Sequence, residues 1–223
     1  MSEQTLRVHD FLPASRANGP GLRAVIWVQG RSLDCPGCFN PETHSPTGGE
    51  LVSIDALYRR IVALKAPTIE GITISGGERV SPEARHRHDN SPMKSSIEGI
   101  TISGGEPLGQ ARPLLALLRR IKAETACSSE CALSVVLFTG YSWAEIQRRP
   151  TARDMLACVD VLVAGRYDRS QPVREPLRSS ANQTLHRLTE RYTETDLQAL
   201  PPAEIILTAE GEVLLSGADP VKW

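Results

Sequence analysis

Apolar strands alternate with amphipathic helices along most of this chain, and this alternation limits the folds that the chain can adopt. Apolar side chains recur at helical spacing over residues 54–65 and 111–124, which predicts a helix in each place. Short, nearly continuous apolar runs around them predict buried strands at residues 22–29, 97–103, 132–138 and 159–164. Because strands that are apolar on both faces belong to sheets covered by helices, the sequence predicts an α/β fold with a parallel sheet.

The pattern is weaker in the C-terminal quarter of the chain. Residues 166–183 read as a polar loop, residues 185–192 as a short helix, and residues 204–217 as a β-hairpin. The length is sufficient for one domain with a sizeable core. We therefore expect a single domain over residues 1–223, in which residues 166–223 form a C-terminal extension.

One segment is duplicated. The ten residues IEGITISGGE occur at 69–78 and again at 97–106, separated by 18 mostly polar residues. Removing residues 69–96 joins Thr68 to Ile97 and restores a continuous helix–strand–helix pattern. The sequence therefore predicts that residues 69–96 are a tandem insertion rather than a solenoid repeat, which would need more copies.

Only one of the two copies can fill the strand position in the sheet. We expect it to be the second copy, because Glu106 is followed by Pro107 and a predicted helix. In the first copy, Glu78 is followed by Arg79 and the polar segment. The first copy is then displaced from the parallel sheet.

Composition excludes several classes of partner. The 25 basic and 26 acidic residues give a net charge of -1, so there is no electrostatic reason to expect nucleic acid or an anionic membrane as partner. The apolar runs are too short to span a bilayer, and the polar start does not read as a signal peptide. Five cysteines, an odd number, do not fit a secreted disulfide framework. We expect a cytoplasmic protein.

Two segments at the predicted carboxyl ends of strands carry chemistry, and ligands bind at such ends in parallel sheets. Cys35 and Cys38 are spaced as CxxC in a loop after one strand, which indicates metal or redox work in a reducing compartment. Ser103-Gly104-Gly105-Glu106 ends another, where glycines let a ligand approach the backbone and Glu106 offers an acceptor for an ammonium group. The plainer alternatives are incidental loop thiols and an ordinary strand-to-helix turn.

Together, CPGCFNPETH and ITISGGEPL resemble the motifs of radical S-adenosylmethionine (SAM) enzymes. The chain most resembles the small activating enzymes of glycyl-radical proteins, above all those of anaerobic ribonucleotide reductase. The likeness runs from about residue 18 to about residue 190 and includes FTGY at 138–141, VDVLVAGRYD at 159–168 and SSANQTLH at 179–186. The fold that it implies is a partial (β/α) barrel of radical SAM type, here with a C-terminal β-hairpin.

The resemblance also implies an activity. In that family three cysteines hold a 4Fe–4S cluster, SAM binds its fourth iron, and an electron from the cluster cleaves SAM to a 5′-deoxyadenosyl radical. This radical takes a hydrogen atom from a glycine of a partner enzyme. Carried over, Cys35 and Cys38 match two cluster ligands, and Ser103, Gly104, Gly105 and Glu106 match the SAM-binding segment. The implied partners are a glycyl-radical enzyme, such as the large subunit of anaerobic ribonucleotide reductase, and an electron donor such as a flavodoxin or ferredoxin.

Arg31 stands where the family has the first cluster cysteine. A guanidinium stays protonated and has no lone pair to offer a metal. The chain as written is therefore expected to bind a cluster poorly. Two alternatives stay open: a catalytically silent relative with the same fold, and a structural zinc module, for which two further ligands are missing.

The other three cysteines are not expected to bind a metal at the strand ends. Cys127 and Cys131 have CxxxC spacing but follow the helix at 111–124, on the wrong side of a β/α unit for a site at the strand ends. Cys158 is expected to be a buried core thiol. Because the site must reach a glycine inside another protein, its mouth is expected to be open, with residues 14–21 and 166–183 as the rim.

Overall fold

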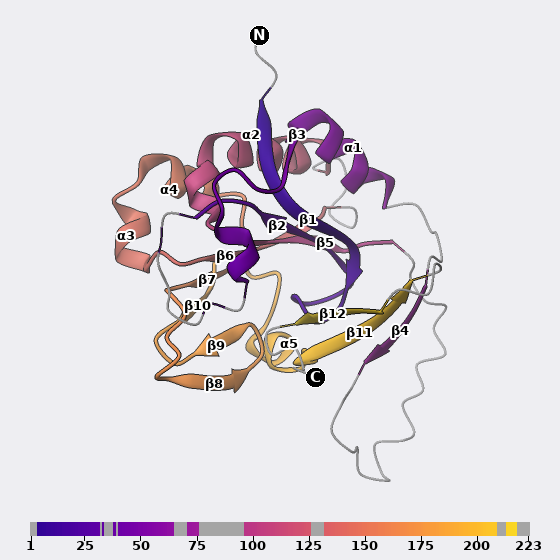
Figure 1. Cartoon of the computed structure of the whole chain (residues 1–223), viewed down its shortest axis with the longest axis vertical. Coiled ribbons are helices and arrows are strands. Elements are labelled where there is room, and N and C mark those ends of the chain that lie inside the picture. The colour runs from indigo at the N-terminus through magenta and orange to yellow at the C-terminus, as the bar shows by residue number, and fades with distance from the viewer. Residues whose placement is uncertain are drawn as a thin grey trace.

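A seven-stranded mixed sheet forms the centre of the protein (Figure 1). The computed structural model describes residues 4–31, 33, 38, 40–64, 71–75, 96–125, 132–208 and 213–217. The strands of this sheet, in spatial order, are β10 (Thr184–Arg187), β7 (Val161–Ala164), β6 (Ser134–Thr139), β5 (Gly99–Gly104), β2 (Arg23–Val28), β1 (Thr5–Ser15) and β3 (Glu50–Ser53). The four central strands β2, β5, β6 and β7 are parallel, so their carboxyl ends lie at one edge of the sheet.

Helices cover one face of this sheet and enclose the main core. They are α1 (Ile54–Ala63), α2 (Ala111–Thr125), α3 (Trp143–Gln147) and α4 (Pro150–Leu156). The helices pack apolar residues such as Leu57 and Leu118 against sheet residues such as Ile26 and Ile102, all of them at most 1% exposed. Burial of this apolar area is the largest favourable term in folding. The start of α1 is fixed by Ser53, whose hydroxyl accepts a hydrogen bond from the backbone N–H of Ala56.

The other face of the large sheet is covered by β8 (Pro172–Glu175), β9 (Arg178–Ser180), α5 (Glu194–Gln198) and a second sheet. Figure 1 shows these elements as a separate layer below the large sheet. At the amino ends of the parallel strands this layer encloses Arg23, which is fully buried and donates to the hydroxyls of Thr101 and Ser134 at 2.9 and 2.8 Å. Burial lowers the pKa of Arg23. Hydrogen bonds to hydroxyls and carbonyls make this buried charge tolerable.

The second sheet has three strands in the order β12 (Val213–Gly217), β11 (Ala203–Thr208) and β4 (Gly71–Ser75). The two copies of the duplicated segment therefore lie in different sheets. The second copy forms β5 between β2 and β6, as predicted. The first copy forms β4, which pairs antiparallel with β11. An edge strand offers unpaired backbone groups, and β4 satisfies those of β11.

Most of the predicted elements are present. The α/β class and the C-terminal β-hairpin are confirmed, whereas the partial barrel of radical SAM type stays a prediction. The sheet is mixed rather than parallel, because β1, β3 and β10 pair antiparallel, and β8 and β9 lie within residues 166–183, where a polar loop was predicted. The helix expected over residues 185–192 is wrong, because residues 184–187 form strand β10, which pairs antiparallel with β7. Backbone pairing at the edge of the sheet overrides the weak local helical pattern. Within the described ranges, none of the helices has the length and apolar character needed to cross a bilayer.

We predict that a variant lacking residues 69–96 folds with a melting temperature close to that of the full chain. The deletion removes β4 and leaves the seven-stranded sheet and its core complete. A long insertion between two elements lowers the free energy of unfolding only slightly, because the entropic cost of closing a loop grows slowly with its length, so removing the insertion should also change stability little. Thermal unfolding followed by circular dichroism measures the difference. Failure of the shortened chain to fold would contradict the interpretation of residues 69–96 as an insertion.

The duplication supplies a matched control for this prediction. Ile74 and Ile102 occupy the same position in the two identical copies, and Ile102 is fully buried in the large sheet. Ile102→Ala is expected to lower the free energy of unfolding by about 2–5 kcal/mol. Ile74→Ala is expected to lower it by much less. Equal losses would show that both copies contribute equally to the fold.

Candidate functional site

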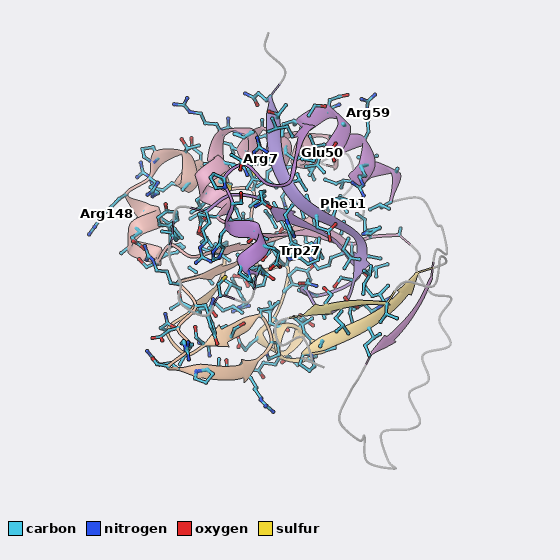
Figure 2. All side chains as sticks on the ribbon, in the orientation of Figure 1. Arg7, Phe11, Trp27, Glu50, Arg59 and Arg148 are labelled. Atoms are coloured by element: carbon cyan, nitrogen blue, oxygen red, sulfur yellow. The ribbon has the colours of Figure 1, made fainter. Side chains whose placement is uncertain are left out.

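A cavity of about 320 Å³ lies at the carboxyl ends of the four parallel strands. This volume falls in the range of small-molecule sites, and the position is the usual one for ligands in parallel sheets. The strand ends supply Trp27, Ser103, Gly104, Gly105, Phe138, Thr139, Gly140 and Gly165 to its lining. Figure 2 shows Trp27 near the centre of the molecule, whereas Arg148 extends outward from it.

The structure brings most of the predicted site residues to this cavity. Ser103, Gly104, Gly105 and Cys38 line it, and Glu106 lies directly behind. Cys35 lies outside the described residues, as do Cys127 and Cys131. Both segments predicted for the rim contribute to the lining, with Ala17 and Asn18 from residues 14–21, and Tyr167, Leu177 and Ser179 from residues 166–183. Their role as the rim of an open mouth stays a prediction.

Backbone hydrogen bonds join the end of β5 to the residues that flank the cysteine loop. The N–H of Gly105 donates to the carbonyl of Val28 at 2.8 Å, and the N–H of Glu106 donates to the carbonyl of Gly30 at 3.0 Å. The N–H of Gly30 donates in turn to Thr43, in the 3-10 helix η1 (Pro41–His44), at 2.8 Å. The end of β5 and the residues on both sides of the cysteine loop therefore form one hydrogen-bonded unit.

This close approach explains both glycines. Gly104 has φ +96°, which side chains with a Cβ rarely adopt, and a Cβ there would lie 2.5 Å from the carbonyl oxygen of Val28. A Cβ on Gly105 would lie 2.4 Å from the carbonyl oxygen of Gly30. In both cases the opposing atom is backbone and cannot move aside. The packing of the two strand ends thus requires glycine whether or not a ligand is bound.

Glu106 connects β5 to β6. Its side chain is 1% exposed, and Oε1 accepts from the hydroxyl of Thr139 at 2.7 Å and from the N–H of Leu108 at 2.9 Å. Oε2 accepts from the N–H of Gly140 at 2.9 Å. Burial raises the pKa of Glu106, and these hydrogen bonds oppose the shift. The carboxylate thus bonds protein donors on both oxygens, and its predicted role toward an ammonium group stays a prediction.

Arg31 lies inside the cavity, against the one cysteine that the structure describes there. Its Nη1 donates to the Sγ of Cys38 at 3.0 Å and lies 3.3 Å from the Nε2 of His44. The positive charge of Arg31 also acts on Glu106, whose pKa it lowers slightly against the larger effect of burial. A guanidinium therefore occupies the space beside the thiol.

The side chains in this loop do not fit a cluster held by three cysteine thiolates. Iron–sulfur clusters are bound by cysteine thiolates, and the chain offers Cys35 and Cys38 in this loop with Arg31 in the third position. The described part of the chain holds no group of three or more His, Cys, Asp or Glu residues placed to bind a metal ion. Cys158 is 8% exposed and packs in the main core, as predicted, so it does not replace the missing ligand.

Other lining residues were not singled out from the sequence. The strand β12 contributes Leu215, Ser216 and Gly217 to the cavity. Its hairpin was predicted, but a local pattern cannot tell across which part of the molecule a hairpin folds. Glu204 of β11 does not line the cavity, but it could have drawn attention to the hairpin, because a charged residue at the start of an apolar strand needs a buried partner.

Comparison with known proteins gives consistent results. The 4Fe-4S single cluster domain family matches residues 17–87 and 79–186. The anaerobic ribonucleoside-triphosphate reductase-activating protein of Vibrio cholerae is 29% identical over 190 residues, which cover 82% of this chain and 99% of the relative. The protein of the same name from Salmonella typhimurium is 28% identical over 188 residues, with coverage of 82% and 99%. The pyruvate formate-lyase-activating enzyme of Clostridium pasteurianum is 34% identical over 59 residues, 26% of this chain and 25% of the relative. The resemblance drawn from the sequence is confirmed.

We predict that Gly105→Ala is far more destabilising than Gly109→Ala. The first change places a Cβ 2.4 Å from a backbone oxygen, whereas nothing lies within 4 Å of a Cβ on Gly109. Gly105→Ala should lower the free energy of unfolding by about 1–3 kcal/mol or more. Gly109→Ala should be neutral or slightly stabilising. Urea unfolding of both variants measures this, and equal effects would contradict the close approach of the two loops.

We also predict that Glu106 makes stability fall as pH rises. Its pKa is raised above the ordinary value of 4.5, so over a range above pH 4.5 the folded state holds a proton that the unfolded state has lost. The free energy of unfolding then decreases with pH until the folded carboxyl has ionised. Glu106→Gln cannot ionise and should lack this part of the slope. Urea unfolding from pH 4.5 upward compares the slopes, and identical slopes would show that Glu106 does not titrate differently on folding.

Proposed function

Because this chain belongs to the 4Fe-4S single cluster domain family, we propose that it is an activating enzyme of the radical SAM type that acts on a glycyl-radical partner. Relatives that cover most of the chain are named activating proteins of anaerobic ribonucleoside-triphosphate reductase, so the chain is an enzyme by resemblance. The large subunit of an anaerobic ribonucleotide reductase is the partner that this likeness favours. A flavodoxin or ferredoxin is the corresponding electron donor, and the cytoplasm the corresponding compartment.

The single observation on which the proposal turns is the contact of Arg31 with Cys38. Three features support a cofactor site here: the strand-end position, the cavity and the CxxC loop. The guanidinium 3.0 Å from the Sγ of Cys38 supports a site that lacks one cluster ligand. The chain as written then binds a cluster poorly and cleaves SAM slowly or not at all.

The SAM-binding segment belongs to the same proposal. Ser103, Gly104 and Gly105 line the cavity and are the residues that would face SAM. Glu106 would act behind them, since its carboxylate holds the ends of β5 and β6 together. SAM carries an ammonium, a sulfonium and a carboxylate group, so its net charge is positive and the positive charge of Arg31 is a further obstacle to its binding.

A catalytically silent relative is the second candidate, and Arg31 is the observation that favours it. Such a protein would keep the fold and the surface that meets the partner. The two candidates differ in what happens when the third thiolate is restored. An activating enzyme should gain a cluster and turnover, whereas a silent relative with further losses should gain neither.

We predict that Arg31→Cys restores cluster binding and SAM cleavage. The substitution removes the guanidinium and supplies the third thiolate in the position that the family uses. The measurements are iron and sulfide content after anaerobic reconstitution and 5′-deoxyadenosine release under a strong reductant. Arg31→Ser is the matched control, since it removes the charge without adding a ligand. We expect high iron content and turnover in Arg31→Cys alone.

Two results would contradict this account. Equal cluster loading and turnover in the unchanged chain and in Arg31→Cys would show that another group completes the site. Restoration by Arg31→Ser would show that the charge of Arg31, rather than the missing thiolate, is the obstacle.

A further inference from the structure

The β11–β12 hairpin forms a wall of the central cavity. Leu215, Ser216 and Gly217 of β12 line the same cavity as Cys38 and Gly105. Figure 1 shows β12 below the large sheet, on the side of the second layer. The family match ends at residue 186, so this hairpin lies outside the part of the chain that the family defines.

Side chains fasten the hairpin to the loop after β1. Glu204 of β11 is 1% exposed and accepts hydrogen bonds from the hydroxyl of Ser15 and from the backbone N–H of Arg16, the latter at 2.9 Å. On β12, the hydroxyl of Ser216 accepts from the Nδ2 of Asn18 at 2.6 Å. Buried, charge-assisted bonds of this kind fix orientation. The hairpin is therefore held in place against the end of β1 and the loop that follows it, with β12 in the lining of the cavity.

β12 is an edge strand. In the described part of the chain it pairs only with β11, so half of its backbone N–H and C=O groups point away from that partner. The opposite edge of the same sheet already carries an added strand, because β4 pairs with β11 from Gly71 to Ser75. The sheet thus accepts an extended segment along its edge.

The edge strand also exposes apolar side chains. Val213 is 58% exposed and Leu214 is 38% exposed. Adjacent residues of a strand point to opposite faces, so β12 presents an apolar group on each face. Edge strands with exposed apolar residues tend to pair with another chain unless something blocks them. Neither a charge nor a proline does so between Val213 and Gly217.

We propose that β12 is the docking strand for the glycine-bearing segment of the partner protein, which adds to its free edge as an extended strand. This inference rests on the proposed function, which requires a glycine of another protein to reach the cavity. A strand added to β12 would pair along Leu215, Ser216 and Gly217, which line the same cavity as Cys38 and Gly105. Backbone pairing supplies affinity that is independent of sequence, and Val213 and Leu214 supply apolar contacts.

The test uses the full chain and a fluorescein-labelled synthetic peptide that spans the radical-forming glycine of an anaerobic ribonucleotide reductase large subunit. Binding is measured by fluorescence anisotropy. Two further peptides carry N-methyl groups on alternate backbone amides, one on the odd set and one on the even set. In an added strand only one set donates to β12, so one methylated peptide should lose binding and the other should keep it.

Substitutions in the protein provide the second arm of the test. Val213→Lys with Leu214→Lys places charges on the edge strand and should weaken binding roughly tenfold or more. Leu51→Lys is the matched control, because Leu51 is 55% exposed on the edge strand β3 of the large sheet. Leu51→Lys should leave the affinity unchanged. Size-exclusion chromatography with light scattering follows the oligomeric state of each variant.

Three outcomes would overturn the inference: no peptide binding, equal binding of both methylated peptides, or equal effects of the β12 and β3 substitutions. A dimer that the β12 substitutions dissociate would assign the edge to a second copy of this chain instead. The proposed function is tested separately by iron loading of Arg31→Cys. Cluster binding and SAM cleavage in Arg31→Cys without peptide binding would refute the docking strand alone. Peptide binding by Arg31→Cys that still fails to load a cluster would refute the activity alone.

Discussion

The candidate site depends on the hydrogen-bonded junction between the end of β5 and the loop that follows β2. Gly105 donates to Val28 and Glu106 donates to Gly30, so backbone hydrogen bonds tie the SGGE segment to the residues that precede the cysteine loop. The approach is so close that backbone oxygens occupy the space of a Cβ at Gly104 and Gly105. This constraint sets the shape of the cavity before any ligand is considered.

Charge inside the cavity decides what this arrangement can do. Glu106 is buried behind the lining, with both oxygens bonded to protein donors. Arg31 places a guanidinium against Cys38, where a metal site needs a thiolate. The scaffold of an activating enzyme and the donor set of a cluster site therefore disagree at one residue. Replacing this one side chain by cysteine separates the two candidate functions, because only an activating enzyme should then gain a cluster and turnover.

The sequence predicted the parts of the fold that have strong local signals. The helix over residues 111–124 and the choice of the second copy for the large sheet follow from periodicity and from Pro107, and the structure agrees with both. Residues 185–192 were misassigned, because a sheet edge supplied by β7 decides their conformation. The fastening of Glu204 to the loop after β1 links residues almost two hundred positions apart, and no local pattern encodes such a contact.

A crystal structure of the unchanged chain after anaerobic reconstitution with iron and sulfide tests the central claim most directly. The account predicts that Arg31 Nη1 stays about 3.0 Å from the Sγ of Cys38 and that no iron is bound to this thiol. A cluster ligated by Cys35 and Cys38, with Arg31 turned out of the cavity and another group in the third position, would contradict it.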